Sequence, residues 1–257
     1  APLPPPAPVA PTPTEPEPVA PELAEDIVPV EQVIGMVGKI QAALLHGTPD
    51  FNYGSIVRLA DKPFRPSRIS TLGIGRLACS PDLSVLVRVL SNYLDHGGVH
   101  RDEVAELMTR CERPSGFLTG DKTQDLLTVL AEDPIWRKEQ DHAFSGLYWG
   151  AAAGTAMGLG IHTALGHAIL ADAMFLGDLS TSRMAAEAPE PRTNQSDEAT
   201  WLASFLEARR GLLERLGQQA LIPSRVDAYL SMVAGDDAWN LTPGMILTVG
   251  DKEIVLP

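Results

Sequence analysis

A run of 29 residues, 143–171, contains no Asp, Glu, Lys or Arg, and it limits the possible folds more than any other part of the sequence. Within it Gly150, Gly154 and Gly158 repeat every four residues, a spacing typical of closely packed helices. The run is long enough to cross a bilayer, so a membrane span is one interpretation. However, Gly, Ala and Thr predominate over Leu, Ile and Phe, and they contribute little transfer free energy. We therefore expect a long central helix that its neighbours pack closely on all sides.

Apolar residues recur at helical spacing through most of the chain after Val30, so the sequence predicts a mainly α fold with a minor β component. The expected helices share this periodicity and cover about 31–46, 82–96, 101–111, 122–132, 134–176, 197–217 and 223–234. Ser80 is expected to cap the helix that begins near Asp82, and Gly97-Gly98 to end it.

Two short hairpins and a loop complete the predicted elements. One hairpin pairs about 54–60 with 68–74 across a proline-rich connection, and the other turns at Gly250-Asp251 near the C-terminus. Residues 178–197 are rich in small and polar residues, and we expect them to be a loop.

Residues 1–29 differ from the rest of the chain, because more than a third of them are proline and almost none is large and apolar. Such a segment cannot bury enough apolar surface to fold, and it favours the extended polyproline II conformation. We interpret it as a semi-rigid linker that tethers one domain, residues 30–257, to something upstream. A ligand for a proline-binding module is an alternative interpretation of this composition.

The charge and the metal-binding residue types exclude several classes of function. A net charge of −13 and a pI near 4.8 argue against a nucleic-acid-binding protein, which should carry a basic face. Cys79 and Cys111 do not match a zinc motif, and they could form a disulfide or remain two buried thiols. His162 and His167 are five residues apart, unlike the i, i+4 pair of a zinc helix, so we expect no metal and no cofactor.

The C-terminal third carries the most specific pattern. TWLASFLEARR, residues 200–210, is followed by PSRVDAYLSMVAGDDAWNLTP, residues 223–243. This order of a Phe-Leu-acid-Ala-Arg stretch, a Ser-Arg-Val-Asp element and an Asn-Leu segment before a proline resembles the end of family 46 of the glycoside hydrolases. These are the chitosanases of the lysozyme-like superfamily.

Earlier segments resemble the same family in a consistent order. LGHAILADAMFLGD, residues 165–178, is similar to a helix that presents a buried Asp in that family. GTPDFNYGSIVRLAD, residues 47–61, is similar to a turn of its bacterial members, and CSPDLSVLVRVLSNYL, residues 79–94, to the helix after it. The resemblance covers 31–257. It implies a lysozyme-like, two-lobed helical body with a small β-hairpin, a long central helix and a polysaccharide groove between the lobes.

The resemblance also indicates where catalytic carboxyl groups would lie. Glycosidic cleavage needs an acid that protonates the leaving oxygen, and an inverting enzyme needs a carboxylate about 6.5–9.5 Å away. In the family the acid is a Glu at the end of the first helix, where this chain has Leu45, or His46 if the register shifts by one. Neither residue can act as that acid in the family's manner. If the chain is active, Asp50 on the turn and Asp61 in the hairpin loop are the candidate relocated carboxylates.

The charged residues behind this position match the family better. Asp172 and Arg209 match a buried pair behind the catalytic Glu, and Arg225 and Asp227 match the Ser-Arg-Val-Asp element. We expect the four to form a supporting charge network. Such a network persists for stability, because removing one member of a buried ion pair is costly.

These observations favour a catalytically inactive chitosanase-like domain, a pseudoenzyme that binds peptidoglycan or another amino-sugar polysaccharide or serves as a scaffold. The linker would tether it to a larger extracytoplasmic assembly in the periplasm, at the cell surface or in an exported particle such as a phage tail or injection machine. We expect neither a nucleic-acid partner nor a membrane span. Two alternatives stay open: an active muramidase or chitosanase that uses relocated carboxylates, and a docking body without glycan contact.

Overall fold

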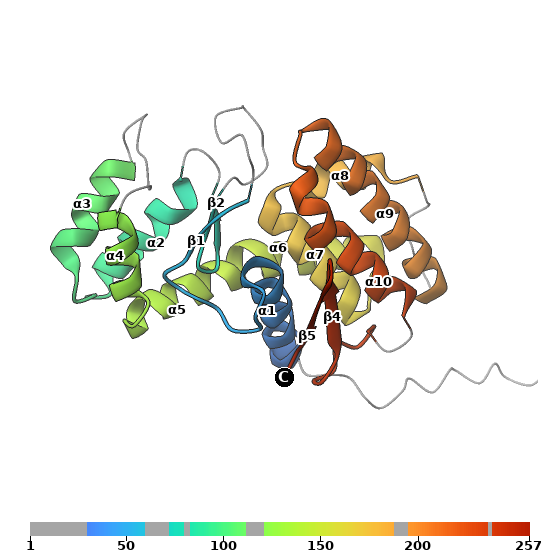
Figure 1. Cartoon of the computed structure of the whole chain (residues 1–257), viewed down its shortest axis with the longest axis horizontal. Helices are drawn as coiled ribbons and strands as arrows, with labels where there is room; N and C mark the ends of the chain where they lie inside the picture. The colour runs from blue at the N-terminus through green and yellow to red at the C-terminus, as the bar shows by residue number, and fades with distance from the viewer. Residues whose placement is uncertain (1–29, 60–71, 80–82, 112–120, 188–194, 236–237) are drawn as a thin grey trace, which may run out of the picture.

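Residues 30–59, 72–79, 83–111, 121–187, 195–235 and 238–257 are described by the computed structural model. The predicted linker (1–29), Ser80 and Asp61 lie outside these residues. Over the described residues the chain is mainly helical with two small antiparallel sheets (Figure 1), as the sequence predicts. Two separate clusters of buried apolar side chains divide it into a smaller and a larger lobe.

The smaller lobe combines a three-stranded sheet with four helices. Its elements are β1 (Ile56–Arg58), β2 (Leu72–Ile74), β3 (Leu77–Cys79), α2 (Ser84–Asp95), α3 (Arg101–Cys111), α4 (Asp121–Leu130) and α5 (Pro134–Ala143). β1 pairs with β2 and β2 with β3, so a third strand extends the predicted hairpin. Cys79 and Cys111 are both buried in this lobe, and no disulfide joins them.

Helix α2 shows how the sequence builds this lobe. Leu86, Val89, Leu90 and Tyr93 recur at spacings of three and four residues, and all four are buried where α2 contacts α3 and α5. The chain leaves the helix through Gly97, whose left-handed backbone (φ 79°) explains the glycine predicted to end it.

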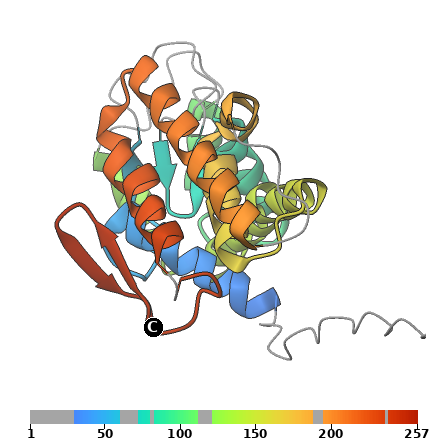
Figure 2. The same ribbon diagram turned by 90° about the vertical axis from the view of Figure 1, so that its right-hand side faces the viewer.

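The larger lobe contains the first helix and the C-terminal half of the chain. Its elements are α1 (Val30–His46), the π-helix η1 (Phe144–Trp149), α6 (Gly150–Leu159), α7 (Ala164–Leu176), α8 (Leu179–Ala185), α9 (Gln195–Arg215), the 3₁₀-helix η2 (Gln219–Leu221), the π-helix η3 (Pro223–Asp227), α10 (Ala228–Ala234), β4 (Ile246–Val249) and β5 (Lys252–Val255). β4 and β5 form the predicted terminal hairpin, which lies at the edge of the lobe beside α1 (Figures 1 and 2).

The long helical stretch predicted over 134–176 is interrupted once, between Leu159 and Ala164. A π-helical turn, η1, connects α5 to α6, and Gly160 ends α6 with a left-handed backbone (φ 72°). Thr163 then caps α7, because its hydroxyl accepts a hydrogen bond from the N–H of Gly166. The prediction therefore holds over 134–159 and fails beyond Leu159, because a left-handed glycine and a threonine cap end one helix and begin another even inside an apolar run.

The charge-free run is also not packed on all sides. Most of α7 is buried, but α6 exposes Gly150, Gly154, Met157 and Gly158, and Met157 is 77% exposed. A Cβ added at Gly154 or Gly158 would meet no atom within 4 Å, so the glycine repeat faces solvent. None of the helices in the described part of the chain is long and apolar enough to cross a membrane.

Residues 178–197 contain a helix that the sequence analysis missed. α8 covers seven residues in this stretch and packs against α9. Two helical turns present too few apolar positions for a periodic pattern to stand out among small and polar residues.

Candidate functional site

Helix α1 ends where the family resemblance places an acid. Its last turn is Ala-Leu-Leu-His, residues 43–46, and Gly47 then turns the chain away with a left-handed backbone (φ 74°). Leu45 is half-buried and packs against the core of the larger lobe. It also lies close to β2, since a Cβ on Gly73 would be 3.5 Å from Leu45 Cδ2. The side chain at this position therefore offers only carbon atoms.

His46, the other position at which the resemblance could place the acid, is partly buried. Its Nε2 is buried and has no hydrogen-bond partner among the described residues, and its ring meets Phe51 edge-on with centroids 6.1 Å apart. Burial first, and then the positive charge of Arg225, lower the pKa of His46 below its usual value. An imidazole with a lowered pKa is mostly neutral at neutral pH, so it is poorly suited to donate a proton to a leaving oxygen.

The two candidate relocated carboxylates differ in what the structure shows of them. Asp50 is exposed on the turn after α1, where its backbone carbonyl accepts a hydrogen bond of 3.3 Å from the Thr48 hydroxyl. Asp61 is not among the described residues. The separation of the two carboxyl groups, which would indicate an inverting or a retaining geometry, therefore stays untested.

A polar cluster connects the turn after α1 with the smaller lobe. Asp141 of α5 accepts hydrogen bonds from the Tyr53 hydroxyl (2.9 Å) and from Arg76 Nη1 (2.5 Å). The Arg76 guanidinium lies over the rings of Phe51 and Phe144, at 4.5 and 4.1 Å from their centroids. Burial first, and then the charge of Asp141, raise the pKa of Tyr53, so its hydroxyl stays a donor. Phe144 belongs to the larger core, so this cluster joins the two lobes.

Three of the four predicted network residues meet at the centre of the larger lobe. Arg209 Nη1 lies 2.8 Å from Asp172 Oδ2 and donates to the backbone carbonyl of Arg225 at 3.0 Å. Arg225 Nη1 pairs with the other carboxylate oxygen of Asp172. All three side chains are at most 1% exposed, so they form a buried charge network contributed by α7, α9 and η3.

Asp178 completes this network, and the sequence analysis did not single it out. Its Oδ2 lies 2.6 Å from Arg209 Nε, and burial raises its pKa while Arg209 opposes that effect. Burial alone would lower the pKa of Arg209, but Asp178 and Asp172 raise it well above its usual value. Two carboxylates thus face two guanidinium groups. The sequence feature that could have indicated a buried Asp178 is its position between the helix-ending Gly177 and the apolar Leu179.

Asp227, the fourth predicted member, is not part of the buried network. Its side chain is half-exposed and lies 2.5 Å from Arg210 Nη2, on the outer side of α9. Arg225 and Asp227 are two residues apart on a helical turn, so they point in different directions. The prediction assigned both Arg225 and Asp227 to one network, and it did not account for this difference in direction.

Some buried polar atoms in and beside the network lack hydrogen-bond partners among the described residues. They include Arg225 Nε, Asp178 Oδ1 and the hydroxyl of Tyr229. Burial, followed by the charge of Asp172, raises the pKa of Tyr229 well above its usual value, so its hydroxyl stays protonated. Arg225 Nε is therefore a buried donor on the same guanidinium whose charge acts on His46.

The described residues contain no group of three His, Cys, Asp or Glu side chains that could hold a metal ion. His162 is exposed, and its backbone N–H donates to Glu198 at 3.0 Å. His167 forms a 2.8 Å hydrogen bond through Nδ1 with the carbonyl of Thr163. The two histidines therefore have separate local roles at the start of α7.

Comparison with known proteins places this architecture in a family. Residues 117–244 match the model of glycosyl hydrolase family 46. A comparison with curated proteins found no match.

The fold is similar to those of solved chitosanases. A complex of the Gynuella sunshinyii GH46 chitosanase GsCsn46A with chitotetraose aligns with a TM-score of 0.72 and 19% identity, covering 90% of this chain and 99% of that one. A mutant chitosanase from Bacillus subtilis MY002 complexed with 6 GlcN aligns with a TM-score of 0.66 and 19% identity, covering 89% and 99%. Since the family model and the fold agree, we conclude that this chain carries a glycosyl hydrolase family 46 domain with the chitosanase, lysozyme-like fold.

Proposed function

We propose that this family 46 domain binds an amino-sugar polysaccharide without cleaving it. The observation that carries the proposal is the last turn of α1, where Leu45 packs a hydrocarbon side chain against the core. His46 next to it has a lowered pKa and a buried Nε2. Neither side chain of this turn can protonate a glycosidic oxygen as a carboxylic acid does.

The buried charge network supports the same proposal. Its two arginines and two aspartates balance one another, so the larger lobe does not need a carboxylate from α1 to compensate a buried charge. The fold can therefore be kept after loss of the acid.

The choice of ligand class rests on the similar structures, whose descriptions name chitotetraose and 6 GlcN as the bound sugars. For this chain we propose chitosan or peptidoglycan, both amino-sugar polymers, as the ligand. We further propose an extracytoplasmic location, where such polymers occur, with residues 1–29 as the tether to a larger assembly.

Turnover and binding assays test this proposal. We expect the full chain to co-sediment with insoluble peptidoglycan or chitosan while releasing no new reducing ends from either. The variant Leu45→Glu places a carboxyl group in the last turn of α1, and trace cleavage by this variant alone would identify Leu45 as the substitution that removed the activity.

Steady cleavage by the unchanged chain would overturn the proposal. If Asp50→Asn or Asp61→Asn then abolished that cleavage, the domain would be an active glycoside hydrolase with relocated carboxylates. Absence of retention on both polymers at low salt would instead leave a scaffold without glycan contact.

A further inference from the structure

His46 is a titratable residue at the end of α1 whose protonated form has no stabilising partner. Its ring is half-buried, and its Nε2 is buried without a hydrogen-bond partner among the described residues. The histidines that lie within 4 Å of a carboxylate in this part of the chain are His96 and His142, so His46 pairs with none of the described acids. Protonation puts a hydrogen on both ring nitrogens, and one of them would then be a buried donor without an acceptor.

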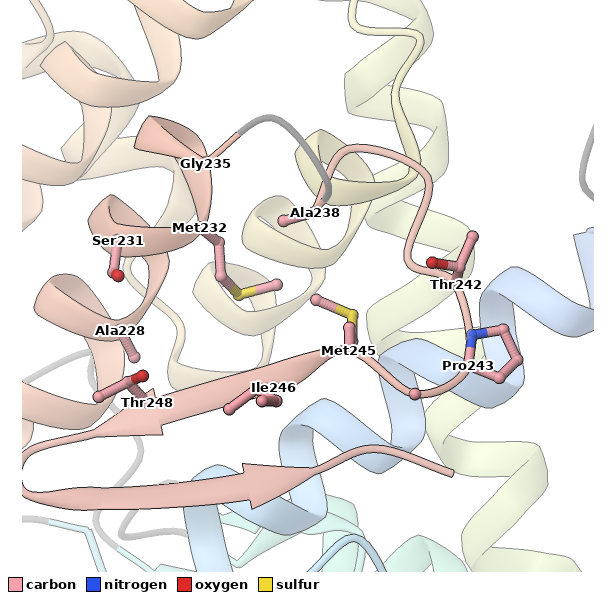
Figure 3. Close-up of a pocket in the computed structure, with 11 residues that line it drawn as sticks. Ala228, Ser231, Met232, Gly235, Ala238, Thr242, Pro243, Met245, Ile246 and Thr248 are labelled. Atoms are coloured by element: carbon pink, nitrogen blue, oxygen red, sulfur yellow. The ribbon is translucent and has the colours of Figure 1, made fainter.

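On the side of the larger lobe, His46 faces a positive charge. Burial first, and then the charge of Arg225 in η3, lower the pKa of His46. Asp172 of α7 does not compensate, because it is already paired with both Arg209 and Arg225. The cavity of about 530 Å³ between α10, the segment that follows it and β4 offers no counter-charge, since none of its lining residues is charged and His46 is not among them (Figure 3). The C-terminal end of a helix favours a positive charge, but burial and Arg225 outweigh this effect.

On its other side, His46 contacts the cluster that joins the two lobes. Its ring meets Phe51 edge-on, with centroids 6.1 Å apart. The Arg76 guanidinium lies 4.5 Å from the Phe51 centroid and 4.1 Å from that of Phe144 in the larger core. The carboxylate of this cluster, Asp141 of α5, is paired with Arg76. A change at His46 is therefore passed to the contact between the lobes through Phe51.

The turn after α1 is held firmly at its end but not at its start. Gly47 has a left-handed backbone, and a Cβ there would meet no atom within 4 Å. Asp50, the acid of this turn, is exposed. The carbonyl of Tyr53, by contrast, accepts hydrogen bonds from Trp136 Nε1 (3.0 Å) and Gln140 Nε2 (2.9 Å) of α5. An opening that begins at the end of α1 would therefore stop before Tyr53.

We propose that protonation of His46 turns its ring out to water and opens residues 47–52. Phe51 then loses a ring contact, so Arg76 holds the two lobes together less firmly. This pH-sensitive switch acts between about pH 5 and pH 8, the range in which histidine changes its charge. The inference does not depend on whether the domain binds or cleaves a glycan.

Hydrogen exchange followed by mass spectrometry at pH 5.5 and pH 7.5 tests the switch, with each rate divided by the intrinsic rate at the same pH. We expect the amides of 47–52 to exchange up to about tenfold faster at pH 5.5. The reason is that His46 has an ordinary pKa near 6.5 in the open form and takes up a proton that the closed form binds less readily. The amides of α9 should keep their protection, which separates a local opening from global unfolding.

Substitution of the histidine provides the matched variants. His46→Asn should exchange equally over 47–52 at the two pH values, whereas His162→Asn, at an exposed position, should keep the response. His46→Phe, which keeps a ring beside Phe51 but cannot take up a proton, serves as a second test if His46→Asn is unstable.

Three results would overturn the proposal. One is an unchanged exchange of 47–52 at pH 5.5 in the unaltered chain. Another is a pH response that persists in both His46 variants, because a different group would then take up the proton. The third is an equal acceleration in α9, because the whole lobe would then unfold.

Discussion

Arg209 places a positive charge at the centre of the larger lobe with none of its side chain exposed. Its guanidinium contacts Asp172 on one side and Asp178 on the other, and it also bonds to the Arg225 carbonyl. Next to it in the sequence, Arg210 forms ion pairs on the surface. The two neighbouring arginines therefore separate the effect of a buried network from that of a surface pair.

We expect Arg209→Met to lower the free energy of unfolding by about 3–5 kcal/mol, because it leaves the buried Asp178 without a cation and Asp172 with Arg225 alone. Arg210→Met should cost no more than about 1 kcal/mol, because exposed pairs are screened by solvent. Urea denaturation followed by tryptophan fluorescence measures both. Equal losses in the two variants would contradict a stabilising role specific to the buried network.

His46 predicts a pH dependence of stability. Its pKa is lowered in the folded state by burial and by Arg225, while in the unfolded chain it is ordinary, near 6.5. As pH falls below that value the unfolded chain takes up a proton that the folded one binds less readily, so this residue's contribution is lost at acid pH. We expect His46→Asn to reduce the drop in unfolding free energy between about pH 7.5 and pH 5.5.

The exposed His162→Asn provides the control for this experiment. An unchanged pH dependence in His46→Asn would show that the buried Nε2 does not resist protonation. Denaturation midpoints at a series of pH values measure the difference.

At the scale of elements, glycines that look alike in the sequence have opposite roles. A Cβ on Gly54 would lie 2.4 Å from the Leu127 carbonyl oxygen, a backbone atom that cannot move aside easily, whereas a Cβ on Gly154 of α6 would meet nothing within 4 Å. Gly54 thus permits a close approach between the turn after α1 and α4, and Gly154 only adds flexibility to a helix.

We expect Gly54→Ala to destabilise the protein by about 1–3 kcal/mol through overpacking. Gly154→Ala should stabilise it by about 0.5–1 kcal/mol, because Ala restricts the unfolded chain and favours the helix. Thermal unfolding of both variants provides the measurement. Destabilisation by Gly154→Ala would show that the exposed face of α6 is occupied in solution.

The elements that could be predicted are those whose signals are local. The helix at 101–111 and the hairpin at Gly250-Asp251 have the expected bounds, because periodicity and a turn dipeptide define them directly. The division of 134–176 could not be predicted from its apolar run. It depends on the left-handed backbone of Gly160 and on Glu198, which accepts the His162 and Thr163 N–H groups from a distant helix.

The candidate site divides in the same way. Asp172, Arg209 and Arg225 meet in the buried network that their match to a family pattern predicts, whereas the assignment of Leu45 to the acid's position stays a prediction. The role of Asp178 could not, because its partner Arg209 is 31 residues away in the sequence. No local pattern shows which of several aspartates a folded chain will bury.

At the scale of the molecule, a polar cluster around Arg76 joins the two lobes. Arg76 from the smaller lobe lies between Phe51 and Phe144 and pairs with Asp141. Its side chain is 12% exposed, so most of its guanidinium is shielded from water. This residue therefore fixes one lobe against the other.

We expect Arg76→Met to lower the free energy of unfolding by about 1–2 kcal/mol, since it removes both cation–π contacts and a partly buried ion pair. The matched control is Arg137→Met, which removes an exposed pair with Glu132. Hydrogen exchange followed by mass spectrometry should show faster exchange at the turn after α1 and in α5 only for Arg76→Met. Equal exchange in both variants would show that the lobes are held together elsewhere.

The pairing of α1 with α7 and β4 has a consequence for synthesis on the ribosome. β4 is translated about 200 residues after α1, which corresponds to roughly 10–40 s at ~5–20 residues per second. During this interval α1 lacks β4, and in the first part of it α7 as well, while the smaller lobe, which is continuous in sequence, can already close its own core. The smaller lobe of the nascent chain can thus fold while the larger lobe is still incomplete. The first helix is therefore the segment that stays available to a chaperone for the longest time.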